Sequence, residues 1–175
     1  MIGYHNLHYK SLVLRTNIKK DESICKKHEF YMQKALLQAK IAAAHNEVPI
    51  GAVIVTPDGM VIARAYNKVE THACQTGHAE VLAIQKAAKK FGDWRLNGCS
   101  IYVTLEPCLM CLGLICLSRI EKVFFGATSP IFGTGSLTSN TNLVHNYLKK
   151  LDIEGGIKEK DCADLLKSFF RKKRN

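Results

Sequence analysis

Two short stretches of the sequence contain the side chains that a metal-dependent hydrolase needs. The first is His78-Ala79-Glu80, and the second is "PCLMC", which contains Cys108 and Cys111. Imidazole and thiolate groups are typical zinc ligands, and a catalytic zinc ion has three protein ligands and leaves its fourth position to water. A carboxylate that is not a ligand can take a proton from that water and pass it to a leaving amine. The combination predicts one zinc site with Glu80 as its proton shuttle.

The spacing within each pair indicates where it must lie in the fold. Cys108 and Cys111 at a helix start would point about 60° apart, and a helix N-terminus lowers the pKa of thiols. His78 and Glu80 would point about 200° apart on a regular helix. They can converge only where the chain enters a helix, and Gly77 marks such an entry.

Less specific interpretations exist for each residue. A CxxC pair alone can be a redox pair, a pair of zinc ligands or two inert core residues. His78 can be a cap or a surface group, and Glu80 can complement the helix dipole. A closed, structural zinc site is a further alternative, because His72 or Cys74 could supply a fourth ligand. Four coincidences in this order and spacing are nevertheless a weaker explanation than one site.

Hydrophobic periodicity and turn residues predict the elements that position these groups. Helices are predicted at 29–44, 78–92, 107–118, 145–151 and 159–174, and strands at 49–55, 60–66, 100–105 and 122–127. The turn "TPDG" makes the first two strands a hairpin, and residues 67–77 have the polar composition of a loop. Gly92 closes the second helix, and Pro107 suits the first position of the third. Alternating helices and strands predict an α/β fold whose sheet is covered on both faces.

Length and composition are typical of one globular domain. The chain has 175 residues, of which 47% are hydrophobic, enough for a core of its own. No apolar run approaches the roughly 20 residues of a membrane span, so we expect no membrane association. Seven cysteines at irregular intervals favour a reducing compartment over a secreted disulfide framework, and we expect a cytoplasmic protein.

The positive charge is concentrated at the two ends of the chain. Of the net +10, residues 1–28 carry +4 (six Lys/Arg against two acids), and residues 158–175 carry +4 (seven against three). Such ends are typical of a polyanion binder, although the charge can also merely solvate frayed termini. Residues 1–28 show no sustained periodicity. We therefore expect a basic, disordered extension at 1–28 and a zinc-dependent domain at 29–175.

Several stretches resemble the tRNA-specific adenosine deaminases of the TadA type, in the cytidine deaminase-like superfamily. "HAE" and "PCLMC" match the H-x-E and P-C-x-x-C signature of zinc deaminases. The similarity extends over about residues 29–174, through "VPIGAVIV", "YNKVETHACQTGHAEVLAI", "WRLNGCSIYVTLEPCLMC", "SRIEKVFFGA" and "CADLLKSFFRKKR". The chain is similar to that family well beyond the metal motif.

The resemblance implies a fold and a reaction. The fold would be a three-layer α/β/α sandwich with a five-stranded mixed sheet, and the protein would form a homodimer. Each subunit would bind one Zn²⁺ through His78, Cys108 and Cys111. With Glu80 as proton shuttle, the enzyme would hydrolyse adenosine to inosine at the wobble position of a tRNA anticodon stem-loop.

The resemblance also implies residues that contact RNA. Asn67 would hold the target nucleotide, although an asparagine after a strand is also a common turn residue. Phe170 offers a ring for base stacking, and Arg171 and Arg174 offer phosphate contacts. One of the two phenylalanines at 169–170 is expected to anchor the last helix to the core instead.

The sequence departs from the family in the loop "TSPIFGTGS". Ser129 and Ile131 stand where relatives usually have an acidic residue and a lysine, which affects the expected grip on RNA and leaves the metal site intact. Two alternative functions therefore remain open. One is deamination of a free base such as guanine or cytosine, and the other is a non-catalytic RNA-binding subunit. The presence of Glu80 argues against the second.

Overall fold

One five-stranded sheet forms the centre of the molecule in the computed structural model, which describes residues 22–133 and 151–174. The strand order is β2-β1-β3-β4-β5, with bounds β1 Gly51–Val55, β2 Val61–Tyr66, β3 Ser100–Leu105, β4 Lys122–Ala127 and β5 Asp152–Glu154. β1 pairs antiparallel with both β2 and β3, while β3, β4 and β5 are parallel. The predicted five-stranded mixed sheet is confirmed.

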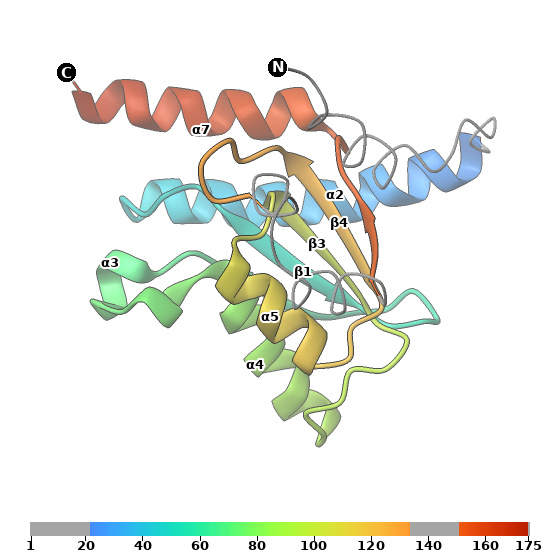
Figure 1. The fold of residues 1–175 in the computed structure, drawn as a ribbon. Helices are drawn as coiled ribbons and strands as arrows, with labels where there is room; N and C mark the ends of the chain where they lie inside the picture. Colours follow the sequence, from blue (N-terminus) through green and yellow to red (C-terminus); the bar gives the residue numbers. More distant parts are fainter. Residues whose placement is uncertain (1–21, 134–150, 175) are drawn as a thin grey trace, which may run out of the picture.

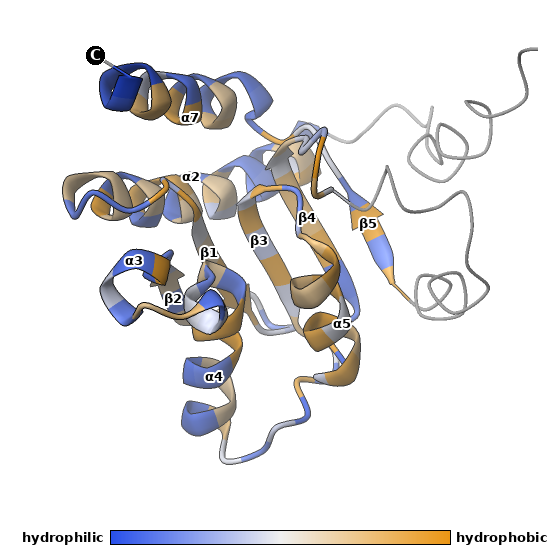
Figure 2. Cartoon of the chain, turned by 60° about the vertical axis from the view of Figure 1, so that its left-hand side comes forward, coloured by the Kyte–Doolittle hydropathy of each residue, from blue (hydrophilic) through white to orange (hydrophobic). Residues whose placement is uncertain are grey.

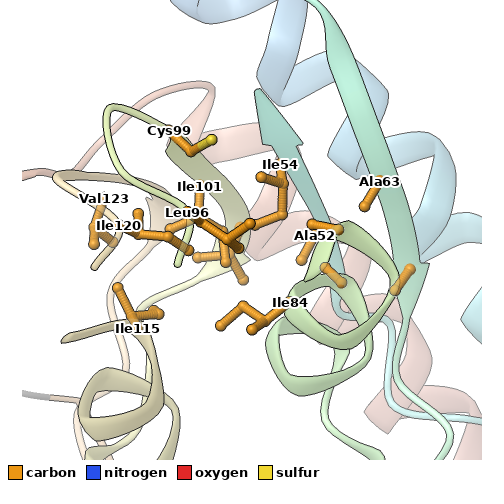
Figure 3. Close-up of a cluster of buried hydrophobic side chains, with 14 of the residues drawn as sticks. Ala52, Ile54, Ala63, Ile84, Leu96, Cys99, Ile101, Ile115, Ile120 and Val123 are labelled. Atoms are coloured by element: carbon orange, nitrogen blue, oxygen red, sulfur yellow. The ribbon is translucent and has the colours of Figure 1, made fainter. Parts of the chain in front are cut away.

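Helices cover both faces of this sheet (Figure 1). On one face lie α2 (Glu22–Ala44) and α7 (Glu159–Arg174), which pack on side chains such as Val53, Tyr102 and Phe124. On the other face lie α4 (Ala79–Phe91) and α5 (Leu109–Leu117). Figure 3 shows the apolar cluster between these two helices and the sheet, with Ile84 and Ile115 facing Ile54 and Ile101. The α/β/α sandwich is therefore confirmed.

Several predicted elements agree with the structure to within two residues. The hairpin forms β1 and β2, and α7 spans the predicted 159–174. α4 ends at Gly92, whose left-handed φ of 74° is the conformation that favours glycine at a helix end. These elements were predictable because local periodicity and turn chemistry point the same way as the tertiary contacts.

The first helix begins earlier than predicted, because α2 starts at Glu22 and not at residue 29, so the predicted boundary at 28/29 falls inside it. That helix begins at Glu22, and its first turns are exposed and polar, without the apolar spacing that predicts a helix. Tertiary contacts stabilise it instead: His28 Nδ1 lies 2.8 Å from the Tyr102 hydroxyl, and its ring packs against Phe124. Residues 1–21 of the predicted extension lie outside the described residues.

Three smaller predictions also need correction. α5 begins at Leu109 with Cys108 as its N-cap, so Pro107 precedes the helix and does not open it. The loop 67–77 contains two short helical turns, α3 (Val69–His72) and η1 (Gln75–Gly77). β5 was not among the elements predicted by residue range. The helix predicted at 145–151 lies outside the described residues, apart from its last position.

Candidate metal centre

The three predicted ligands meet where two helices begin. His78 is the N-cap of α4, with extended backbone angles (φ −60°, ψ 144°), and Cys108 is the N-cap of α5. Cys111 lies in the first turn of α5. The ligand atoms of His78, Cys108 and Cys111 all lie within 4.8 Å of one another. Because β3 leads directly into Pro107 and Cys108, the site sits at the carboxyl end of a parallel strand, the usual place for a ligand in an α/β sheet.

The distances between these atoms fit a tetrahedral metal ion. His78 Nδ1 lies 3.7 Å from Cys108 Sγ and 3.4 Å from Cys111 Sγ. An ion bound about 2.0–2.1 Å from nitrogen and about 2.3 Å from sulfur in tetrahedral geometry places these atoms about 3.5 Å apart. The two measured distances lie on either side of this value, and the two sulfur atoms lie within 4.8 Å of each other, so the spacing is compatible with a bound metal ion. In both contacts the nitrogen that faces the sulfur atoms is Nδ1.

The electrostatics of the cluster also suit a cation. The Cys111 thiol donates a hydrogen bond to Cys108, and this bond, with a further one from His78, lowers the pKa of Cys108 to about 4. The same hydrogen bond to Cys108, together with burial, raises the pKa of Cys111. A single thiolate is therefore stable here by itself, whereas a second thiolate needs a positive charge beside it. A divalent cation supplies that charge and deprotonates coordinating thiols.

Glu80 is a buried carboxylate next to this cluster. It is 3% exposed, and within the described part of the chain its buried Oε2 atom has no hydrogen-bond partner. Burial raises the pKa of Glu80, although a hydrogen bond from its own backbone N–H and the nearby His78 act in the opposite direction. An unpaired buried carboxylate oxygen is unfavourable for folding. Its position in the first turn of α4, two residues after a candidate ligand, points to a chemical role.

Asn67 lies at the start of the loop that leads into His78. It is buried, and its Nδ2 donates to Glu47 Oε2 at 3.1 Å. The backbone N–H of Lys68 donates to the Gly77 carbonyl at 2.8 Å, which closes the loop immediately before His78. The loop therefore connects the predicted nucleotide contact to the first metal ligand through a short, hydrogen-bonded path.

A second loop, residues 128–133, lies beside Cys108. Gly133 forms an isolated β-bridge with Cys108, and the backbone N–H of Ser129 donates to Glu106 Oε2 at 2.9 Å. A side chain at Gly133 would collide with the Glu106 carboxylate, so only glycine allows this approach. Ser129, one of the two departures from the family pattern, thus holds the loop, while Ile131 is 76% exposed.

The remaining predicted RNA contacts lie at the end of α7, on the other face of the sheet from α4 and α5. Phe169 is 9% exposed and Phe170 is 46% exposed, so one ring anchors the helix and the other faces solvent, as expected. Arg171 and Arg174 are exposed. The last turns of α7 are hydrophilic, and they lie on the same side of the molecule as α3 (Figures 1 and 2).

Sequence reasoning missed two residues of this region, Glu47 and Glu106. Both are buried carboxylates that hold a loop beside the metal cluster. A signal was available, because each is a charged residue next to proline and an apolar strand, in "NEVPIG" and "TLEPC". Charged residues in such positions are usually buried only when paired.

Comparison with known proteins agrees with this geometry. The chain matches the family model for MafB19-like deaminases over residues 26–174. It is 44% identical over 146 residues to the tRNA-specific adenosine deaminase of Bacillus subtilis (strain 168), covering 83% of this chain and 90% of that protein.

Solved structures show the same similarity. A chain from studies of A-to-I editing by tRNA:A34 deaminases at the wobble position of transfer RNA has a TM-score of 0.70 and 36% identity, covering 78% of this chain and 99% of that one. A guanine deaminase from Bacillus subtilis has a TM-score of 0.57 and 37% identity, covering 68% and 74%. The structure from the tRNA deaminase studies thus agrees with this chain over a greater length.

Proposed function

The chain belongs to the family of tRNA-specific adenosine deaminases, and we propose that His78, Cys108 and Cys111 hold its zinc ion while Glu80 moves the proton. The enzyme converts adenosine to inosine at the wobble position of a tRNA anticodon. The observation that carries the assignment of roles is the unpaired, buried Glu80 oxygen beside a His/Cys/Cys cluster with tetrahedral spacing.

The reaction exchanges the amino group at C6 of adenine for oxygen. Water supplies the oxygen, a C–O bond forms, the C–N bond breaks, and ammonia leaves. His78, Cys108 and Cys111 would hold the zinc ion, and its positive charge would make the attacking water more acidic. Glu80 accepts the proton of that water and returns it to the departing amine. Burial raises the pKa of Glu80, which favours its protonated form when the proton is passed on to the amine.

The substrate is held by groups from separate elements. Asn67 would hydrogen-bond the target nucleotide at the metal end, and Phe170, Arg171 and Arg174 would contact the RNA at the end of α7. Stacking on an exposed ring and phosphate contacts from exposed arginines are the usual means of gripping single-stranded RNA. The net charge of +10 supports binding of a polyanion.

A homodimer is also part of this proposal. α5 is hydrophobic along nearly its whole length, unlike α4, whose outer face is hydrophilic (Figure 2). Leu109, Met110 and Leu117 on α5 are exposed, and a second copy would cover them. Light scattering on the purified protein measures this directly, and a monomeric mass at micromolar concentration would contradict it.

We place the enzyme in the cytoplasm. All seven cysteines are free, including the exposed Cys25 and Cys74, which suits a reducing compartment. Among the helices that the structure describes, none is both long and apolar enough to cross a membrane.

The decisive experiment offers the enzyme two kinds of substrate. Unmodified tRNA with adenosine at the wobble position is incubated in parallel with free adenine, guanine and cytosine. We expect inosine, read as an A-to-G change on sequencing, at that one position, and no ammonia from the bases. Ammonia from guanine with unchanged tRNA would overturn the proposal in favour of a free-base deaminase.

A further inference from the structure

Glu47 is a fully buried carboxylate that binds the side chain of Asn67. It is 0% exposed and lies between α2 and β1. Its Oε2 atom accepts from Asn67 Nδ2 at 3.1 Å and from the backbone N–H of Glu70 at 3.2 Å. Its Oε1 atom accepts from the backbone N–H and the hydroxyl of Thr71, both at 2.7 Å. Both oxygens are therefore fully used.

These contacts require Glu47 to be an ionised acceptor. Burial opposes ionisation, but the hydrogen bonds from Thr71 and Glu70 outweigh it and lower the pKa of Glu47. An ionised carboxylate accepts hydrogen bonds and donates none. Every group facing it must consequently be a donor, which two backbone N–H groups and one hydroxyl satisfy.

The same requirement decides how the Asn67 amide is oriented. An amide has a donor end and an acceptor end that differ little in shape. Facing Glu47, only the NH₂ end is favourable, because the carbonyl end would place two acceptors against each other. Within the described residues, this donation is the hydrogen bond that the Asn67 side chain makes. The carbonyl oxygen Oδ1 and the second N–H of the amide then take fixed positions from which they can meet a substrate.

We propose that Glu47 is a positioning residue that fixes the orientation of the Asn67 amide, so that its Oδ1 and its second N–H meet the target nucleotide in set positions. The inference rests on the proposed function, in which Asn67 contacts that nucleotide. Glu47 also holds the backbone at Glu70 and Thr71, in the loop that ends at Gly77 immediately before His78. The nucleotide contact and the metal ligand are thus set by one loop with one buried anchor.

Exchange of the carboxylate and the amide tests this proposal. Glu47→Gln puts a donor where the acceptor was, and Asn67→Asp puts two carboxylates about 3 Å apart. Each single variant should lower kcat/KM on wobble-adenosine RNA by about tenfold or more. In the double variant the new amide donates to the new carboxylate, whose other oxygen again faces the substrate as an acceptor. Because the new amide also faces the backbone N–H of Glu70, we expect partial recovery: kcat/KM of the double variant should be about tenfold or more above the product of the two single effects, with zinc content equal to wild type throughout.

Thr71→Val is the matched control. It removes one hydrogen bond to Glu47 without changing the group that faces Asn67, and kcat/KM should stay within about threefold of wild type. A decrease as large as that of Glu47→Gln would mean that Glu47 only anchors the loop, and the inference would be wrong. If Glu47→Gln does not fold, comparing Asn67→Asp with the double variant still tests the inference. Only a role of Glu47 in orienting the amide predicts that the double variant is more active than Asn67→Asp.

The outcomes separate this inference from the function on which it rests. If the wild-type protein leaves wobble adenosine unchanged, both the proposed function and the Glu47 inference are wrong. If the wild-type protein is active and the activity of the double variant equals the product of the two single effects, the Glu47 inference is wrong and the proposed function stands. An active wild-type protein with a rescued double variant supports both.

Discussion

Glu47 and Glu80 are both buried glutamates, but their carboxylate oxygens differ in hydrogen bonding. Glu47 is 0% exposed and Glu80 is 3% exposed, so neither side chain is solvated by bulk water. Glu47 accepts hydrogen bonds with both oxygens, whereas, within the described residues, the buried Oε2 of Glu80 accepts none. The pKa shifts follow: hydrogen bonds lower the pKa of Glu47, and burial raises the pKa of Glu80.

The difference separates positioning from chemistry. A fully bonded carboxylate fixes whatever donates to it, and its proton affinity is too low for proton transfer near neutral pH. A carboxylate with an open oxygen is costly to bury, and it persists where that oxygen has a task during reaction. The loop 67–77 connects the surroundings of the two glutamates. It begins at Asn67, whose amide donates to Glu47, and it ends at Gly77, one residue before His78.

Replacement of a proposed metal ligand should have the largest effect, because the proposed reaction depends on the ion that this residue would hold. Cys111→Ser should reduce zinc content to background and abolish turnover, since a serine hydroxyl is a poor replacement for thiolate. Cys116→Ser, on the same helix but outside the cluster, is the control and should retain both. Elemental analysis and the inosine assay give the two readings. A Cys111→Ser protein with full zinc would show that the ligand set is different.

Glu80→Gln should separate activity from stability. We expect turnover to fall by about 10²- to 10⁴-fold, the usual contribution of a general acid–base group, while zinc and RNA binding persist. The free energy of unfolding should not decrease, because an unpaired buried carboxylate is replaced by a neutral group of the same shape. Denaturant unfolding and single-turnover kinetics measure the two effects. Wild-type turnover would exclude Glu80 as the proton shuttle.

Glu47→Gln should behave in the opposite way in unfolding experiments. Repulsion between the new amide and a backbone N–H should lower the free energy of unfolding by about 1–3 kcal/mol. The same denaturant titration as for Glu80→Gln provides the comparison. Equal stability of the two variants would remove the distinction between a bonded and an unbonded carboxylate.

The pH dependence of stability sharpens this contrast. The pKa of Glu47 lies below its ordinary value of 4.5 in the folded state, so folding favours the ionised form. Its contribution is complete above the unfolded pKa and is lost as pH falls through the lowered folded pKa. Between about pH 6 and pH 3 the wild-type protein should therefore lose more stability than Glu47→Gln. Because both proteins have the same metal centre, acid release of metal cancels in the difference. Parallel stability curves would contradict the prediction.

The three candidate ligands could be located from sequence because they lie in two contiguous stretches at helix starts. His78 precedes a periodic helix, and Cys108 and Cys111 are within one turn of another, so local spacing already places the donors. Glu47 could not be assigned in this way. Its partners Asn67, Glu70 and Thr71 are 20 to 24 residues away in sequence, and only the folded loop brings them to it.

The same reasoning explains the missed start of α2. Its first turns lack apolar spacing, and the contacts that stabilise them come from Tyr102 and Phe124 on distant strands. The family resemblance did not supply this either, since it began at about residue 29. Long-range contacts thus decide both an element boundary and a functional role that the local pattern leaves open.

The smallest effect is expected where charge is fully exposed. Arg171 and Arg174 lie at the end of α7 and face solvent, so replacing both with alanine should leave zinc content and stability unchanged. Each arginine that binds a phosphate releases counterions, so the slope of log K against log salt should become shallower by about one unit for each such arginine removed. Phe169→Ala is a useful contrast, because that ring is 9% exposed and its truncation should destabilise the fold. RNA affinity measured across a salt series decides the point. An unchanged slope would show that these arginines solvate the helix end, which would leave Asn67 and the metal end to hold the RNA.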